Sequence, residues 1–247
     1  MMRDYKKVGK VVSLTRFPVK AMAGEDIEEV NAGWHGLAKD RTFSFMVTNN
    51  KTGFPWLTAR EMPELVRYRP YLTNPANVRE SDIRVITPDG KDLAIESPEL
   101  LEELTQKSGK QIQLLQNWSG IFDAMDVSIM SIESRKSLES IVGSELDSRR
   151  FRANITIETL PYVTRDFPED KFIGCLLKFG EHSDSARVRV KRKDIRCMVV
   201  NINPSTAKQD PIVLKKIVSE RRNLVGVYGT VERPGIIKVG DSIFISK

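Results

Sequence analysis

The chain has 247 residues, of which 40% are hydrophobic and 29% are charged, and this composition is typical of a water-soluble globular protein with one large core or two smaller ones. Its net charge of +6 indicates an anionic partner only weakly, because a mixed surface can carry that excess for solubility. No tract approaches the ~20 apolar residues of a membrane-spanning helix, and no signal-peptide core follows the charged residues 1–7, so we expect a cytoplasmic protein with no membrane partner. Two cysteines and two histidines are too few for a zinc cluster, an iron–sulfur site or a disulfide framework.

The N-terminal region predicts short strands joined by hairpins. Turn residues at 49–53 separate the apolar run 43–47 from Trp56 and Leu57. A Pro-Asp-Gly turn at 88–90 likewise separates two further alternating apolar runs. We expect antiparallel pairs in a first domain that covers residues 1–95.

A helix is predicted after these strands. Ser97 is its N-cap, Pro98 takes the first helical position and Gly109 ends it. Its buried stripe consists of Leu100, Leu101 and Leu104. We expect this helix to join the first domain to a second domain at residues 96–247.

The sequence of the second domain predicts two more helices among its strands. One covers residues 133–141 and ends at Gly143, and the other begins at Asp210. The core side of the latter is predicted to carry Val213, Leu214, Ile217 and Val218. The chain closes with apolar residues 236–239, a turn at 240–241 and apolar residues 243–245. Many short strands with few helices suit a barrel, and no Gly-x-Gly-x-x-Gly stands between a strand and a helix to indicate a Rossmann fold.

A basic strand is predicted at residues 187–193, where charged and apolar residues alternate. The alternation sends Val188 and Val190 into the core and the cations outward. The cations then form either a solvated strand face or a site that neutralises a phosphate or nucleic acid. Nucleic acid is the poorer interpretation, because no aromatic residue for base stacking occurs between Phe179 and Tyr228.

Cys197 stands where this strand gives way to a loop, beside Arg196, Arg192 and Lys193. Such cations favour the thiolate, which binds a soft metal or attacks an electrophile. The alternative is an inert, buried cysteine beside an apolar run. Cys175, which has apolar neighbours and no adjacent cation, is expected to be a packed structural residue.

Several short motifs follow one another along nearly the full length of the chain. They are Phe17-Pro18-Val19-Lys20, Asp40-Arg41, Leu57-Thr58-Ala59-Arg60-Glu61-Met62-Pro63, Arg150-Phe151-Arg152-Ala153-Asn154, and Arg196-Cys197 with the later Asn203-Pro204 and Asp210-Pro211. In number and order these motifs resemble the MOSC family, the molybdenum-cofactor sulfurase C-terminal domain, together with its associated N-terminal domain. The similarity extends to members that reduce amidoximes and other N-hydroxylated bases.

The resemblance implies a mixed, mainly β fold with a few helices, in which a MOSC-type β-barrel is preceded by a smaller β-barrel-like domain. It implies a pterin-based molybdenum cofactor, molybdopterin, with Cys197 as the thiolate ligand to the metal. No pyridoxal phosphate or iron–sulfur cluster is expected in this chain.

The resemblance also implies roles for particular side chains. Lys20 and Arg41 correspond to basic residues that contact the cofactor, and Arg152 and Asn154 to residues that hold the pterin. Asp123 corresponds to an acidic residue near the metal, where a carboxylate orients substrate or relays a proton. Further cofactor contacts are expected at Arg196, Arg222, Asn223 and Tyr228.

Each of these residues also has a structural interpretation. The cations can form surface ion pairs, Asn154 can form a turn and Asp123 can cap one. Two departures from the family pattern stand out, since Ala153 replaces a usual proline and Asp194-Ile195 replaces cysteine and a small polar residue. The second change alters the polarity around the metal.

Two functions follow as expectations. The first is an oxidoreductase that reduces small N-hydroxylated or other N-oxygenated substrates with electrons from a separate ferredoxin or flavoprotein. The second is a noncatalytic module that carries the molybdenum cofactor or transfers sulfur through Cys197. A nucleic-acid-binding barrel is a third, poorer alternative.

Overall fold

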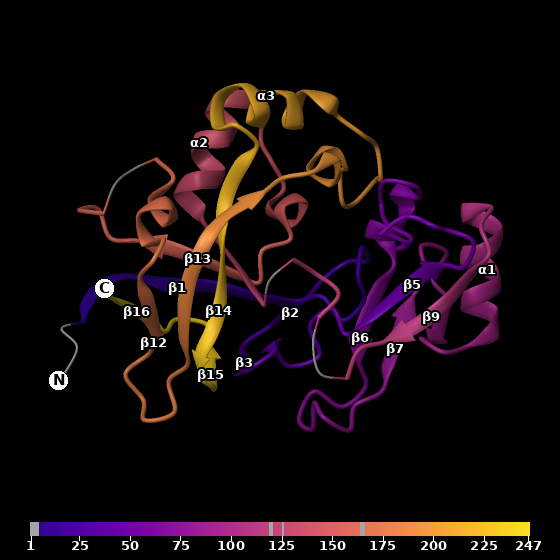
Figure 1. Ribbon diagram of the computed structural model, residues 1–247, viewed down its shortest axis with the longest axis horizontal. Coiled ribbons are helices and arrows are strands. Elements are labelled where there is room, and N and C mark those ends of the chain that lie inside the picture. Colours follow the sequence, from indigo (N-terminus) through magenta and orange to yellow (C-terminus); the bar gives the residue numbers. More distant parts are fainter. Residues whose placement is uncertain (1–4, 119–120, 125, 164–165) are drawn as a thin grey trace.

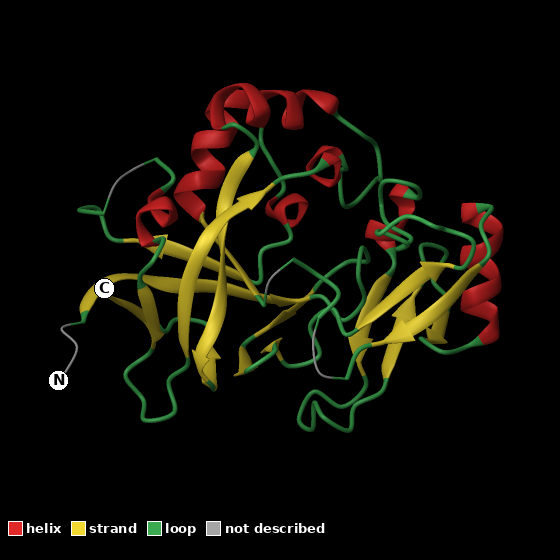
Figure 2. Cartoon of the chain, in the orientation of Figure 1, coloured by secondary structure: helices red, strands yellow, loops and turns green. Residues whose placement is uncertain are grey.

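The computed structural model describes residues 5–118, 121–124, 126–163 and 166–247, and within them the fold is mainly β with three α-helices (Figure 1, Figure 2). The expected fold class, a barrel preceded by a smaller β domain with few helices, is confirmed. Residues 1–4 of the charged N-terminal stretch lie outside the described residues. None of the helices in the described part of the chain is both long enough and apolar enough to cross a lipid bilayer.

Seven strands form a closed barrel. Closure arises because β1 pairs with β16 on one side and with β11 on the other. Neighbouring strands are antiparallel except β10 and β11, which are parallel. The strands around the barrel are β1 (Lys6–Arg16), β11 (Ile155–Thr159), β10 (Val127–Ser131), β14 (Leu224–Arg233), β13 (Arg187–Ile195), β12 (Leu176–Phe179) and β16 (Ser242–Ser246). The short strand β2 (Glu25–Ile27) pairs antiparallel with the C-terminal end of β1.

Gly9 allows β1 to meet both of its neighbours. It is paired with Thr159 on β11 and with Ile243 on β16. A Cβ atom at this position would lie 2.3 Å from the carbonyl oxygen of Glu158. Only glycine therefore permits the close approach of the strands that closes the barrel.

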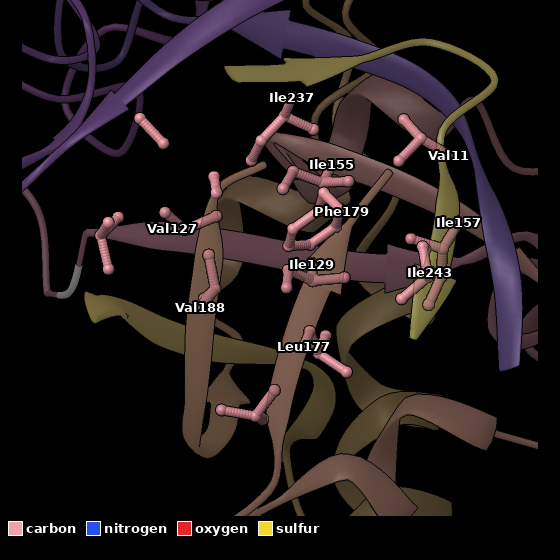
Figure 3. Packing of buried hydrophobic residues seen from close by; sticks show 14 of the residues in the cluster. Val11, Val127, Ile129, Ile155, Ile157, Leu177, Phe179, Val188, Ile237 and Ile243 are labelled. Atoms are coloured by element: carbon pink, nitrogen blue, oxygen red, sulfur yellow. The ribbon is translucent and has the colours of Figure 1, made fainter. Parts of the chain in front are cut away.

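The barrel interior is a packed hydrophobic core. Figure 3 shows side chains from β1, β10, β11, β12, β13 and β16 meeting inside the barrel. Val188 and Val190 on β13 are fully buried, which confirms the inward face predicted for this strand. The core thus draws on both ends of the chain.

Two cations on the outer face of β13 form ion pairs. Arg189 forms an ion pair with Glu232 at 2.9 Å, and the Lys193 ammonium lies 2.7 Å from an Asp170 oxygen. A solvated, ion-paired strand face explains these residues without a nucleic acid.

A second hydrophobic core lies in the smaller β domain. It packs beneath one two-stranded and one three-stranded sheet and is covered by α1. The elements are β5 (Phe43–Val47), the 3-10 helix η1 (Pro63–Arg67), β6 (Arg69–Leu72), β7 (Ile83–Ile86), β8 (Asp92–Ala94), α1 (Pro98–Ser108) and β9 (Ile112–Gln116). Both predicted hairpins are confirmed, since β7 pairs with β8 and Met46 bridges Trp56 in antiparallel sense.

Helix α1 has the predicted ends. The Ser97 hydroxyl accepts a hydrogen bond from the Leu100 amide at 3.2 Å, and Gly109 ends the helix in the left-handed conformation. The domain boundary proposed at residue 95 remains a proposal. In the structure α1 and β9 pack with the smaller core, while β1 and β2 belong to the barrel.

Two helices pack beside the barrel in a third core. They are α2 (Ile132–Val142) and α3 (Pro211–Arg221), with the 3-10 helices η2 (Ser148–Phe151), η3 (Pro168–Phe172) and η4 (Met198–Asn201) nearby in the chain. The α3 stripe is confirmed for Val213 and Ile217, but the assignment of Val218 to the core side was wrong. Val218 is 50% exposed, because it lies one position past the stripe that Val213 and Ile217 form at i, i+4.

The two C-terminal strands do not pair with each other. β15 (Gly235–Lys238) joins a separate small sheet with β3 (Glu29–Gly33) and β4 (Gly36–Leu37), whereas β16 enters the barrel. The turn at residues 240–241 therefore directs the chain from one sheet to another.

We predict that Leu104→Ala lowers the free energy of unfolding by about 2–5 kcal/mol, because it leaves a cavity in the smaller core. Leu101 on the same helix is only partly buried, so Leu101→Ala is the matched control and should cost less. Urea denaturation of both variants measures the difference. Equal losses would contradict the packing described for α1.

Candidate functional site

A pocket of about 160 Å³ lies where loops of the smaller domain meet the barrel. Seven of the residues singled out from the sequence line it. They are Lys20, Arg41, Asp123, Arg152, Arg196, Cys197 and Tyr228. Folding therefore brings together side chains that lie as much as 208 positions apart in the chain, from Lys20 to Tyr228.

Cys197 is exposed at this pocket. It directly precedes η4 in an extended conformation, and its thiol forms no disulfide. The interpretation of Cys197 as an inert, buried cysteine is therefore wrong. Cys175, in contrast, is buried, with 9% of its surface exposed, as expected for a structural cysteine.

The cations that neighbour Cys197 in the sequence contact other groups. Lys193 pairs with Asp170, and the Arg192 guanidinium lies 5.5 Å from the centre of the Tyr228 ring. Arg196 points inward, where its Nη1 donates to the Phe151 carbonyl at 2.6 Å.

The cations that share the pocket with Cys197 come instead from distant segments. Lys20 and Arg152 both line the pocket that Cys197 lines. Burial lowers the pKa of Lys20; Asp123 opposes this effect, whereas the positive charges of Arg41 and Arg152 add to it. Burial, followed by the charge of Arg41, lowers the pKa of Arg152 to about 10. The pocket therefore holds crowded cations whose charge is only partly compensated.

Arg152 has an unused donor. Its Nη1 donates to the Met22 carbonyl at 2.5 Å and its guanidinium lies 4.3 Å from the centre of the Phe17 ring, but its buried Nη2 has no hydrogen-bond partner. Lys20 donates to the Phe122 carbonyl at 2.6 Å. A buried donor on an uncompensated cation fits an anionic group supplied by a ligand.

Arg41 is buried at the back of the pocket. Its Nε lies 2.7 Å from Asp123 and its Nη1 lies 2.5 Å from Asp40. Burial alone would lower the pKa of Arg41, but the two carboxylates outweigh burial and raise it. Burial would likewise raise the pKa of Asp123, but Arg41 and Lys20 outweigh it and lower that pKa. Asp123 is thus held as a carboxylate, which suits orientation of a substrate better than donation of a proton.

Asn154 lies behind the pocket and does not line it. Its Oδ1 accepts hydrogen bonds from Arg41 and from the Ser128 amide, while its Nδ2 donates to Asp40 and to the Thr15 carbonyl. The residue is 1% exposed, and every hydrogen-bonding atom of its side chain is engaged. Its visible role is to fix Arg41 to the barrel strands.

Arg222 and Asn223 also lie outside the pocket. Both are in the left-handed conformation at the end of α3, and the Asn223 carbonyl accepts the Arg196 amide at 2.8 Å. Nearby, Gly226 has a φ of 76°, and a Cβ there would lie 2.9 Å from Arg196 Nη2. These residues position Arg196 and do not themselves border the pocket.

Three charged lining residues were not assigned a role from the sequence. Arg60, Arg150 and Asp194 all border the pocket. Arg60 and Arg150 stand inside motifs that resemble the MOSC family, and Asp194 stands where the chain departs from the family pattern. These features of the sequence could have indicated that the three residues lie at the site.

Asp194 has an unusual environment. It is 2% exposed, and although Arg196 Nη1 lies 2.9 Å away, the Asp194 Oδ2 lacks a hydrogen bond of good geometry. Burial outweighs the charge of Arg196 and raises the pKa of Asp194 to about 6. Burial also raises the pKa of Tyr228, and Asp123 and Asp194 add to that effect.

Comparisons with known proteins agree with this architecture. A model of the MOSC domain matches residues 120–244, and a model of the MOSC N-terminal beta barrel domain matches residues 8–127. The crystal structure of the YuaD protein from Bacillus subtilis is similar in fold, with 15% identity, 99% of this chain and 100% of that chain covered, and a TM-score of 0.52. The structure of YiiM from Geobacillus stearothermophilus shares 20% identity over 50% of this chain and 55% of that chain, with a TM-score of 0.37. No curated protein sequence matches the chain.

We predict that Asp194→Asn stabilises the protein relative to the wild type as the pH rises. The folded-state pKa of Asp194 lies above its unfolded value, so its contribution to stability is full below pH ~4 and is lost as the pH passes ~6. The difference in unfolding free energy between variant and wild type should therefore shift by on the order of 3 kcal/mol between pH 4 and pH 7.

Denaturant titrations at several pH values measure this difference. Comparing the variant with the wild type cancels the other carboxyl groups that titrate in the same range. A pH-independent difference would show that Asp194 ionises normally in the folded protein.

Proposed function

This chain belongs to the MOSC domain family, which is associated with molybdenum-cofactor binding, and we propose that it is a molybdenum-dependent oxidoreductase with Cys197 as the protein ligand to the metal. The supporting observation is the position of Cys197. It is an exposed, unpaired thiol in a pocket that also carries Lys20, Arg41 and Arg152.

The residues of the pocket fit the chemistry of such a cofactor. A thiolate is a soft ligand of the kind that molybdenum accepts. The unpartnered Nη2 of Arg152 and the ammonium of Lys20 suit the anionic tail and the polar edge of a pterin. The pocket volume of 160 Å³ lies below the ~300–1,000 Å³ typical of sites that enclose a whole ligand, so it suits the metal-bearing end.

The five lining residues considered next would each have a task. Cys197 would hold the metal, Lys20 and Arg152 would bind the pterin and its phosphate, and Arg41 would keep Asp123 in place. When bound, the cofactor supplies the two-electron chemistry that the side chains lack. Asp123, ionised and turned toward the pocket, would accept a hydrogen bond from a substrate N–H or O–H group.

The class of substrate is proposed from the mouth of the pocket. Phe54 is 50% exposed and Ile195 is 60% exposed, and both border the opening. An apolar rim with a carboxylate inside suits a small molecule that has an apolar body and a polar N-oxygenated group. A ferredoxin or flavoprotein is the proposed electron donor, in the cytoplasm.

A second candidate is a noncatalytic module that carries the cofactor or transfers sulfur. The exposure of Cys197 favours it, because an accessible thiol can also receive and release a sulfur atom. The raised pKa of Asp194 favours the enzyme, since reduction of an N–O bond consumes protons and a buried acid that titrates near neutrality can supply one.

We predict that Cys197→Ala, expressed in a host that makes the cofactor, retains pterin but loses reductase activity with an artificial electron donor. Lys20→Ala should lose pterin, because it removes a cation that the pocket offers to the anionic ligand. Molybdenum analysis and pterin fluorescence measure the two contents. Lys216→Ala, which changes an exposed lysine on α3, is the matched control.

The outcomes separate the candidates. Wild-type protein with neither molybdenum nor pterin would refute both cofactor-based functions. Full loading without turnover of N-hydroxylated bases would favour the carrier. Lys20 is the better probe than Arg41, because Arg41→Ala would also break a buried ion-pair network and lower stability.

A further inference from the structure

A second and larger pocket, of about 580 Å³, lies beside the pocket at Cys197. The two share Arg150, Arg152 and Val199 in their walls. The larger pocket is bounded by η1 and β6 of the smaller domain and by η2 and the loop after η4 of the barrel domain. Nothing in the function proposed above requires it.

The charge of this larger pocket is strongly unbalanced. Its arginines outnumber its two carboxylates, Asp26 and Asp147, and Asp147 is already paired with Arg149 at 2.5 Å. Asp26 accepts a hydrogen bond from the Thr15 hydroxyl. The arginines are Arg67, Arg69, Arg149, Arg150 and Arg152. Among the described residues, all of them except Arg149 lack an ion-pair partner.

Two of these arginines are also incompletely hydrogen-bonded. Arg150 Nε and Arg152 Nη2 are buried without a partner, although each guanidinium donates once elsewhere, to the carbonyls of Val200 and Met22. Burial lowers the pKa of both arginines. Buried donors on uncompensated cations are costly, and an anion between them would remove that cost.

The rest of the wall restricts the kind of anion. Guanidinium forks match the geometry of a phosphate group. Hydroxyl groups of Ser13, Thr156 and Ser205 and apolar surfaces of Phe17 and Pro204 complete the lining. The volume falls within the ~300–1,000 Å³ of sites that enclose a small ligand.

We propose that the larger pocket binds a phosphate monoester that carries a ring, a ligand of nucleotide size. The phosphate lies at the arginines and the ring lies against the apolar wall. Two sources have this chemistry. One is a free phosphorylated metabolite, which is independent of the function proposed above, and the other is the phosphate-bearing end of the bound cofactor, which rests on that function.

The test uses full-length protein from a host that cannot make the pterin cofactor, so that binding does not depend on molybdenum. Calorimetry compares the four common ribonucleoside monophosphates, their nucleosides, inorganic phosphate and a short single-stranded oligonucleotide. We expect at least one monophosphate to bind about tenfold or more tightly than its nucleoside, as charged hydrogen bonds to the phosphate require. The double variant Arg67→Gln/Arg69→Gln should weaken that binding about tenfold or more.

Arg233→Gln is the charge-matched control, because Arg233 is exposed at the far end of β14 and should leave binding unchanged. Arg69→Glu, at an exposed position, is a second variant in case the double variant folds poorly, and it should weaken phosphate binding as well. Equal binding of nucleotide and nucleoside, no monophosphate binding at millimolar concentration, equal affinity in the variants, or binding of the oligonucleotide alone would each overturn the proposal.

A second arm distinguishes the sources. The same titration is repeated on protein loaded with cofactor. Loss of nucleotide binding on loading assigns the larger pocket to the phosphate end of the cofactor, and retained binding assigns it to a separate metabolite. If no cofactor loads, the function proposed above fails, while the first arm still decides whether the larger pocket binds a phosphate monoester.

Discussion

The candidate site depends on one buried cation. The Arg41 guanidinium contacts Asp40, Asp123 and Asn154, and its Nη2 donates to the Arg152 carbonyl at 2.9 Å. These partners come from segments spread along the chain from Asp40, next to Arg41, to Asn154, more than one hundred positions away. Because a buried charge is tolerated only when it is paired and hydrogen-bonded, these segments must all be in place for Arg41 to be stable. The network therefore couples folding of the barrel to formation of the pocket, and it fixes Asp123 without exposing Arg41 itself.

The cations of the pocket are held in unfavourable backbone conformations and in unfavourable electrostatic surroundings. Arg41 and Arg152 both have positive φ values, 46° and 51°, in a region that residues other than glycine seldom occupy. Burial lowers the pKa values of Lys20 and Arg152, and the positive charge of Arg41 lowers both further. Natural folds retain such unfavourable arrangements mainly at functional sites, where a ligand offsets the cost. An anionic ligand at either pocket would relieve the same repulsion, since Arg152 borders both.

Local signals in the sequence predicted the elements well, and contacts between distant segments were the part that the sequence could not reveal. The caps at Ser97 and Gly109 act within one turn of helix, so they could be identified from neighbouring residues. The cations around Cys197 could not, because sequence proximity pointed to Arg192 and Lys193, whereas the fold brings Lys20 and Arg152 into the pocket that Cys197 lines. The position of Asn154 could not be predicted either. Its motif placed it at the pterin, but the motif does not reveal that its side chain makes all its hydrogen bonds with Arg41, Asp40 and the backbone of the barrel.

The pKa values of the two carboxyl groups that line the smaller pocket are shifted in opposite directions. Cations lower the pKa of Asp123, whereas burial raises that of Asp194 to about 6. Proteins can obtain an anion and a proton source in one site at the same pH by placing two acids in environments that shift their pKa values apart. A carrier of the cofactor needs the anion-binding cations but does not need a second acid that titrates near neutrality beside them. The difference between Asp123 and Asp194 therefore supports the proposed enzyme, in which the carboxylate would orient the substrate and the buried acid would supply the proton that reduction requires.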